Sequence, residues 1–188
     1  MRDDKQQSVE SENSLVRRLQ NGEMDAFDAL FEKFRRKLLA YVRGLVGDVQ
    51  QSEDIVQETF VELARKIQKI RPEKGVGPWL YRVARNRAID LLRHRKFEVL
   101  PGDDYFGEQR RNVVSDAGNA PDERLMAREQ QLEVQKMLAS LPQKERDLLM
   151  LRFYGDLSFA EIAKVVRRPL GTVLWQVRRS LAKLREMG

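Results

Sequence analysis

The sequence contains no cysteine and a single histidine, and these scarcities exclude several classes of function. Without cysteine the chain has no disulfide framework, thiolate metal site or cysteine nucleophile, which fits a reducing compartment. No apolar run approaches the roughly 18 residues that a membrane-spanning helix needs. The polar start, residues 1–14, also lacks the apolar core of a signal peptide. We therefore expect a soluble, cytoplasmic protein without a resident cofactor or metal.

The composition that remains is rich in charge and poor in aromatic residues. Of 188 residues, 34% are charged and 7% aromatic, which suits exposed helices. A hydrophobic share of 41% allows one domain or two small ones. The formal net charge of +6 indicates an acidic partner, either nucleic acid or an anionic membrane surface.

The stretch 78–97 predicts a helix with one packing face and one basic face. Its apolar residues Leu80, Ala84, Ala88 and Leu91 recur at helical spacing. Pro78 suits a first helical position. The opposite side collects Arg82, Arg85, Asn86, Arg93 and Lys96. Such a face fits a phosphate backbone, but composition alone favours a solvated basic face equally.

The residues before this helix have the opposite charge. Residues 48–62 carry five acids and no base, whereas residues 63–97 carry eleven bases and two acids. A helix capped by Ser52 is expected here, with an apolar stripe of Val56, Phe60, Leu63, Ile67 and Ile70. The helix dipole explains the acids Glu53 and Asp54 in a first turn, but not Glu58 or Glu62 further along.

Two further helices are predicted before residue 48. A short one is capped by Asn13 or Ser14 and ends at Asn21-Gly22. The next begins at Asp25, and Gly47 stops it. Its apolar positions keep a helical period, and we interpret it as a core helix.

Residues 98–121 differ in character and predict a flexible linker. They hold three glycines, two prolines, five acids and two bases, without an apolar period. A chain of this length can hold two modules about two turns of DNA apart, at roughly 34 Å per turn. The sequence thus predicts an all-α protein of two small helical domains, residues 1–97 and 122–188.

The last third predicts a helix-turn-helix. A helix through Leu125, Leu132 and Leu138 and a shorter one through Leu148, Leu149 and Leu151 come first. Ser158 and Glu161 form a capping box before a helix that Arg167-Arg168-Pro169 ends. The final helix packs through Leu170, Val173, Val177, Leu181 and Leu184 and carries an outward basic row, which suits the major groove of DNA.

Six stretches together resemble the extracytoplasmic function sigma factors of bacterial RNA polymerase. They are residues 25–27 (DAF), 53–60 (EDIVQETF), 79–88 (WLYRVARNRA), 141–142 (LP), 158–163 (SFAEIA) and 169–173 (PLGTV). The match covers nearly the whole chain. It implies sigma region two in residues 1–97 and sigma region four in residues 122–188, in a protein that is not an enzyme.

The resemblance implies three binding surfaces. Core RNA polymerase would be contacted by Asp54, Gln57 and Glu58. Promoter DNA at the minus-ten element would be contacted by Arg71, Lys74, Arg82, Arg85, Asn86 and Arg93. At the minus-thirty-five element the residues would be Arg167, Arg168, Thr172, Trp175, Gln176, Arg178 and Arg179. It also implies an anti-sigma protein as a partner.

The chain departs from the family pattern at the helix-turn-helix. It has Arg167-Arg168 before the proline and Leu174-Trp175-Gln176 after Gly-Thr-Val, so promoter preference is open. Leu174 is interpreted as core, whereas Trp175 projects outward, towards thymine methyls and sugars or towards a protein. Trp79 and Tyr81, at a helix start, are interpreted as core residues rather than base-stacking platforms.

Three other readings compete with the resemblance. A stand-alone helix-turn-helix regulator would use the last third only and would leave the acidic residues 48–62 without a role. A nucleic-acid enzyme would hold a metal through Asp25, Asp28 and Glu32, or through Asp54, Glu58 and Glu62, but this is also ordinary helix spacing. Binding of the basic helix to a membrane surface is the third.

Overall fold

A computed structural model describes residues 3–98, 138 and 140–187, and every regular element in these ranges is helical. The predicted all-α class is thereby confirmed. The predicted linker after residue 98, and the predicted helix around Leu125 and Leu132, lie outside the described residues. Within the described ranges no helix is long and apolar enough to cross a membrane.

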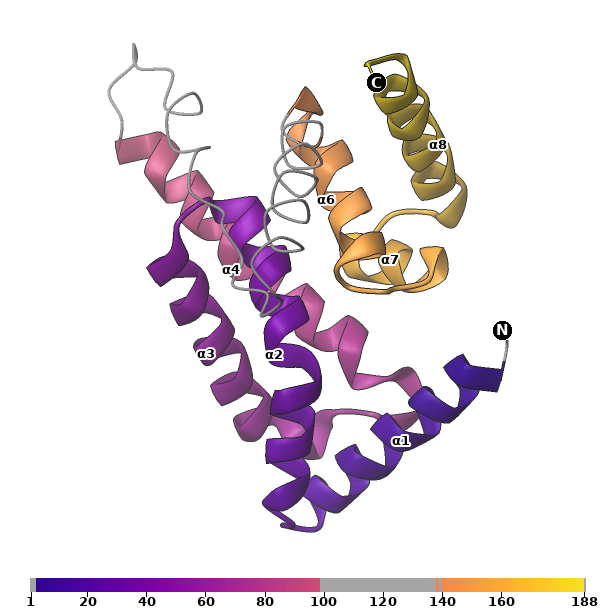
Figure 1. Ribbon diagram of the computed structural model, residues 1–188. Helices are drawn as coiled ribbons and strands as arrows, with labels where there is room; N and C mark the ends of the chain where they lie inside the picture. Colours follow the sequence, from indigo (N-terminus) through magenta and orange to yellow (C-terminus); the bar gives the residue numbers. More distant parts are fainter. Residues whose placement is uncertain (1–2, 99–137, 139, 188) are drawn as a thin grey trace, which may run out of the picture.

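The amino-terminal half consists of four α-helices and two short 3-10 turns (Figure 1). Helix α2 contacts each of the other three helices. All five residues of the apolar stripe predicted for α3 and the turn after it are buried. The elements are α1 (Asp3–Gln20), α2 (Asp25–Val46), α3 (Val49–Lys66), η1 (Ile67–Lys69), η2 (Pro72–Lys74) and α4 (Val76–Glu98).

Helix α2 ends as predicted, but three predicted helix starts are wrong. Gly47 adopts a left-handed φ of 78° and closes α2. Helix α1 begins at Asp3, well before the predicted caps Asn13 and Ser14. Helix α3 is capped by Asp48, whose Oδ1 accepts a hydrogen bond from Gln51 N at 2.8 Å.

Ser52 and Pro78 therefore lie inside their helices. The hydroxyl of Ser52 donates to Asp48 O, one turn back, so its polar group is satisfied within α3. Pro78 stands in the first turn of α4, where the missing N–H costs no intrahelical hydrogen bond.

The carboxy-terminal half forms the predicted helix-turn-helix. Its helices are α6 (Gln143–Phe153), α7 (Phe159–Val166) and α8 (Leu170–Met187). The capping box of Ser158 and Glu161 is present at the start of α7. Arg167 ends α7 in the left-handed region, with φ 55°, and so turns the chain into α8.

The packing face of α8 is narrower than the sequence predicted. Val173 and Val177 are buried, but Leu170 and Leu181 are each 44% exposed. The place expected for Leu181 is taken by Ser180, whose buried hydroxyl contacts Gln176 O and the Glu145 carboxylate of α6. A small polar residue fits this close approach between α6 and α8, so the leucine beside it turns outward.

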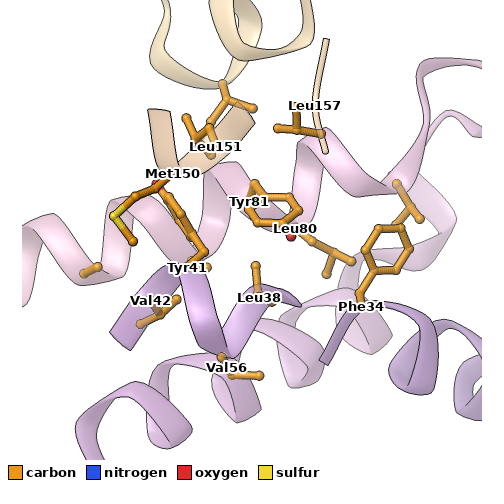
Figure 2. Close-up of a cluster of buried hydrophobic side chains, with 14 of the residues drawn as sticks. Phe34, Leu38, Tyr41, Val42, Val56, Leu80, Tyr81, Met150, Leu151 and Leu157 are labelled. Carbon is orange, nitrogen blue, oxygen red and sulfur yellow. The ribbon is translucent and has the colours of Figure 1, made fainter. Parts of the chain in front are cut away.

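The two halves pack on each other through one continuous apolar core. Helix α2 contacts α6, and helix α4 contacts α7 (Figure 1). Figure 2 shows Met150, Leu151 and Leu157 of the second half lying against Tyr41 and Tyr81 of the first. The two tyrosine rings meet edge to face, with centroids 5.3 Å apart.

Gly44 permits the close approach of α6 to α2. A Cβ atom at this position would stand 1.8 Å from Cε of Met150, so the flexible end of the methionine would have to move. Glycine is therefore needed at position 44 for Met150 to pack as it does.

Candidate functional site

The acidic face of α3 is exposed where the sequence predicted a polymerase contact. Asp54, Gln57 and Glu58 all lie at the surface. Because α3 begins at Val49, no acid lies in its first turn. The helix dipole therefore explains Glu53 and Asp54 less well than the predicted helix start suggested.

One residue of this face that the sequence analysis missed is Arg87. From α4 its guanidinium bonds to Glu58 and, at 2.7 Å, to Glu62. Hydrogen bonds from Lys66 and Arg87 lower the pKa of the Glu62 carboxyl. The distribution of charge along the sequence did not predict this pairing. Arg87 lies in the basic stretch 63–97, but in the structure it packs against the acidic helix α3.

Most of the predicted minus-ten residues are accessible to solvent, and together they are called the basic surface below. Arg71 and Lys74 stand exposed around η2, and Asn86 and Arg93 stand exposed on α4, with Arg82 half-buried. Arg93 also pairs with Asp90 of its own helix at 3.2 Å. The spacing of residues 82, 86 and 93 puts them on one side of α4. The roles of these residues in DNA binding stay predictions.

Arg85 lies apart from that surface and points to the second half of the protein. Its Nε donates to Oδ2 of Asp147, on α6, at 2.7 Å. The side chain of Arg85 is 20% exposed and that of Asp147 only 6%. Arg85 therefore faces α6 rather than solvent in this arrangement, and its contact with the minus-ten element stays a prediction.

Asp147 is held by a second donor from the first half. The Tyr41 hydroxyl donates to its Oδ1 at 2.7 Å. Burial, together with the charge of Asp147, raises the pKa of Tyr41 well above its usual range, so the hydroxyl keeps the proton that it donates. Both carboxylate oxygens are thus satisfied by residues of α2 and α4.

The predicted minus-thirty-five surface is open to solvent. Arg167, Thr172, Arg178 and Arg179 are exposed, and Arg168 and Gln176 are half-buried. Trp175 is 58% exposed, which confirms that it projects outward.

Two contacts organise the side chains of this surface. The Arg179 guanidinium lies over the Trp175 ring, 5.3 Å from its centroid. The Arg168 Nη1 donates to Gln176 Oε1 at 3.1 Å and so links the turn to α8. Both contacts restrict the rotamers of cationic side chains before any ligand arrives.

The aromatic residues at the start of α4 belong to the core, as predicted. Tyr81 is fully buried, and Trp79 packs partly buried against the same cluster. Burial raises the pKa of the Tyr81 hydroxyl, so this side chain stays neutral.

Comparisons with known proteins give the family. Residues 30–98 match the family model Sigma-70 region 2, and residues 137–186 match Sigma-70, region 4. The RNA polymerase sigma-H factor of Pseudomonas aeruginosa is 32% identical over 87% of this chain and 86% of the relative. The ECF RNA polymerase sigma-E factor of Escherichia coli is 31% identical over 85% and 84%, respectively. This chain belongs to the extracytoplasmic function family of RNA polymerase sigma factors.

Solved structures show the same fold for this sigma factor. A structure of CnrH in complex with the cytosolic domain of CnrY matches with a TM-score of 0.67 at 20% identity, over 94% of this chain and 96% of that one. The sigma factor RpoE of Bartonella quintana, in complex with the anti-sigma factor NepR, matches with a TM-score of 0.69 at 22% identity, over 87% and 96%. The two regions of the family thus correspond to the two helical halves.

The positions of the acidic side chains bear on the metal ligands that the sequence analysis considered. In the ranges that the structure describes, no three acidic or histidine side chains gather closely enough to hold a metal ion. The acidic clusters around Asp28 and Asp54, considered above as metal ligands of a nucleic-acid enzyme, lie within those ranges. Their acids are ordinary helix-surface residues, and the sigma factor family is one of initiation factors rather than enzymes.

Proposed function

We propose that this sigma factor docks on core RNA polymerase through the exposed acids of α3 and places the basic surface beside them on promoter DNA. The observation that carries the proposal is the adjacency of the two surfaces. Helices α3 and α4 pack directly against each other, one exposing Asp54, Gln57 and Glu58 and the other exposing bases. A protein that joins a polymerase to DNA needs two surfaces of this kind in a fixed relation.

Arg87 limits which side chains of the acidic surface are available to the polymerase. Since Glu58 is bonded to Arg87, Asp54 and Gln57 are the more available partners for a basic polymerase surface. Arg87 acts as a positioning residue that holds Glu58 and Glu62 in one orientation. Exposed ion pairs of this kind contribute little stability, so their effect is mainly on orientation.

The basic surface of region two is proposed to bind the minus-ten element, including its opened strand. Separating DNA costs about 1.4 kcal/mol per base-pair step, and extruding a base costs a few kcal/mol. Contacts from Arg71, Lys74 and Arg93 to phosphates offset that cost. The amide of Asn86, exposed on α4, can pair with the edge of an extruded base.

Region four is proposed to read the minus-thirty-five element with α8. Arginine can donate to guanine O6 and N7, and an exposed aromatic ring can contact thymine methyls. Arg178 and Arg179 would donate to guanine, and Trp175 would contact thymine methyls. The contact between Trp175 and Arg179 makes them act as a pair, so both affect the same base pairs.

We also propose an anti-sigma protein as a regulatory partner and the cytoplasm as the compartment. The support is the family, together with a solved relative of the same fold, RpoE, whose structure contains the anti-sigma factor NepR. Promoter DNA as the ligand requires the compartment that holds the chromosome. Turnover of DNA by the purified protein with magnesium is expected to be absent.

The deciding experiment is in-vitro transcription with purified core polymerase on a genomic library, followed by sequencing of the start sites. The chain is expected to add a defined set of starts. Asp54→Ala combined with Gln57→Ala should abolish both polymerase association and these starts. The control, Asp28→Ala with Glu32→Ala, removes two exposed acids of α2 and should retain both activities.

The same experiment separates the sigma factor from a stand-alone helix-turn-helix regulator. A regulator would bind DNA through α8 but would need no contact through α3. If the double variant of α3 still associated with core polymerase and initiated normally, the proposed docking surface would be wrong.

A further inference from the structure

A buried polar contact joins the two sigma regions at Arg85, one of the residues for which the family resemblance implies contact with the minus-ten element. Arg85 of α4 bonds to Asp147 of α6, and Tyr41 of α2 bonds to the other oxygen of the same carboxylate. Asp147 is 4% exposed overall, so water does not compete for these bonds. This arrangement is called the Asp147 contact below.

The packed arrangement cannot span a promoter. Residues of α4 and α7 lie within 8 Å of one another between their Cα atoms. A compact chain of this length has a diameter of about 40 Å. Two DNA elements separated by two helical turns lie roughly 70 Å apart. The two regions must therefore separate before both can bind their promoter elements.

We propose that Asp147 acts as an internal substitute for a DNA phosphate: in the free sigma factor it occupies Arg85 and holds region four against the minus-ten surface. The proposal rests on the proposed function, because it takes Arg85 to join the minus-ten surface once the two regions separate. Guanidinium groups bind carboxylates and phosphates with the same donor geometry, so one group can replace the other.

The position of the contact explains how it masks DNA binding. On α4, Arg85 directly precedes Asn86 and lies three residues after Arg82. While Arg85 is engaged, region four packs on the side of α4 that carries Tyr81 and Ala84, which are fully buried, whereas Asn86 stays exposed. Arg71 and Lys74, around η2, stay exposed. The free chain therefore retains part of the minus-ten surface and lacks its Arg85 contribution.

Apolar packing fixes the same arrangement. Met150 sits on Gly44, and Leu151 and Leu157 lie against Tyr81 (Figure 2). The Tyr81 hydroxyl adds only a long contact of 3.4 Å to Tyr154 O. Opening must therefore be driven by binding that favours the separated state, and core polymerase together with promoter DNA supplies such binding.

The first test measures binding of a short mixed-sequence single-stranded DNA to the full chain without polymerase, by fluorescence anisotropy. Asp147→Asn keeps the shape of the side chain and removes the charge. We expect it to bind about tenfold more tightly, as the release of one charge-assisted contact implies. Adding Arg85→Ala to this variant should remove the gain.

Asp156→Asn is the matched control. Asp156 lies in the same region and pairs with Lys37 across the same boundary, but at 4.0 Å and with 74% of its side chain exposed. Any general effect of removing negative charge appears in both variants. If Asp147→Asn binds the probe no more tightly than Asp156→Asn does, the proposal is overturned.

Tyr41→Phe covers the case in which Asp147→Asn does not fold. It removes one donor to the carboxylate and retains the ring, so it should tighten binding by about threefold. An affinity unchanged from wild type in a folded Tyr41→Phe variant would contradict the proposal. Circular dichroism establishes folding for each variant.

A second test locks the packed arrangement. Gly44→Cys together with Met150→Cys places two thiols across the boundary in a chain without other cysteines, and removes the methionine atoms that a Cβ at position 44 would meet. Joining the thiols by oxidation, or by a short cleavable crosslinker, should abolish promoter-dependent transcription with core polymerase. Reduction of the same sample should restore it.

The outcomes of the locking test separate the two proposals. Equal transcription before and after reduction, with the crosslink verified by mass, would overturn the masking role of the Asp147 contact. Absence of transcription in both states, and in the wild type, would instead overturn the proposed sigma function.

Discussion

The two proposed DNA-binding helices differ in how available they are. On α8, Trp175 and Arg179 face solvent and contact each other. On α4, Arg85 is turned into the boundary between the regions and bonded to Asp147. A basic side chain can thus be predicted from sequence on both helices, whereas its availability depends on what the rest of the chain packs against it.

This difference indicates an order of events. The open surface of α8 can meet duplex DNA as the protein stands. The surface of α4 becomes complete only after region four moves away, which is also the condition for spanning a promoter. Recognition of the minus-ten element would then depend on engagement of the polymerase, so that free protein opens little DNA.

The largest effect is expected from a substitution that weakens the packing between the two regions, which is what makes α4 less available than α8. Leu151 is fully buried and packs there (Figure 2). Leu151→Ala should lower the free energy of unfolding by about 2–5 kcal/mol, through lost burial and a residual cavity. Urea denaturation measures the change. Leu181→Ala, at a 44% exposed position of α8, should change it by less than about 0.5 kcal/mol.

A smaller effect is expected from the hydroxyl groups at the boundary. Tyr41→Phe leaves one buried oxygen of Asp147 without its donor and should cost about 1–3 kcal/mol of unfolding free energy. Tyr81→Phe makes the same chemical change in the same cluster. Because its hydroxyl makes only a 3.4 Å contact, it should cost less than about 0.5 kcal/mol. Equal costs would show that the Asp147 contact has no special strength.

The two arginines provide a direct comparison in the free chain. Arg179→Ala should weaken binding of duplex DNA about five- to tenfold and reduce the dependence on salt, because one cationic contact is lost. Arg85→Ala should change binding of the same duplex by less than about twofold, because that guanidinium is already occupied. Titrations at several salt concentrations measure both. A larger loss for Arg85→Ala would mean that α4 is as open as α8.

The smallest effect concerns the ring beside Arg179. Trp175→Ala removes the cation–π contact and should weaken duplex binding about two- to fivefold. Trp175→Phe keeps an aromatic face and should retain most of the affinity. Selection from a random duplex library would show whether the preference at single base pairs changes with the ring. An unaltered preference in Trp175→Ala would assign the tryptophan to a protein contact.

Local pattern predicted most of the fold. The period of the apolar residues located α2, α3, α4 and the helix-turn-helix, and Gly47 and Ser158 end or begin helices where the sequence indicated. The residues at which helices start were predicted less accurately, because several residues near a helix start can act as caps. Asp48 competes with Ser52, and the polar residues before Asn13 extend α1 without any apolar signal.

The sequence predicted the charge of the site residues, but not the residues to which they bond. The exposed acids of α3 and the exposed bases of α8 follow from helical spacing alone. Partners across long sequence separations do not, and so the bond from Arg87 to Glu58 and the bond from Arg85 to Asp147 appear only in the structure. A single acid in the otherwise apolar run 147–151 was the available signal, since a buried carboxylate requires a cationic or hydrogen-bonding partner.

The most direct test of the account is a distance between the two regions. Lys37→Cys and Phe153→Cys place spin labels at exposed positions of α2 and α6. In the free chain, the labels should lie closer than about 40 Å, the diameter of the packed protein. With core polymerase and promoter DNA, we predict that this distance lengthens towards the roughly 70 Å of two DNA turns. An identical short distance in both states would contradict the account.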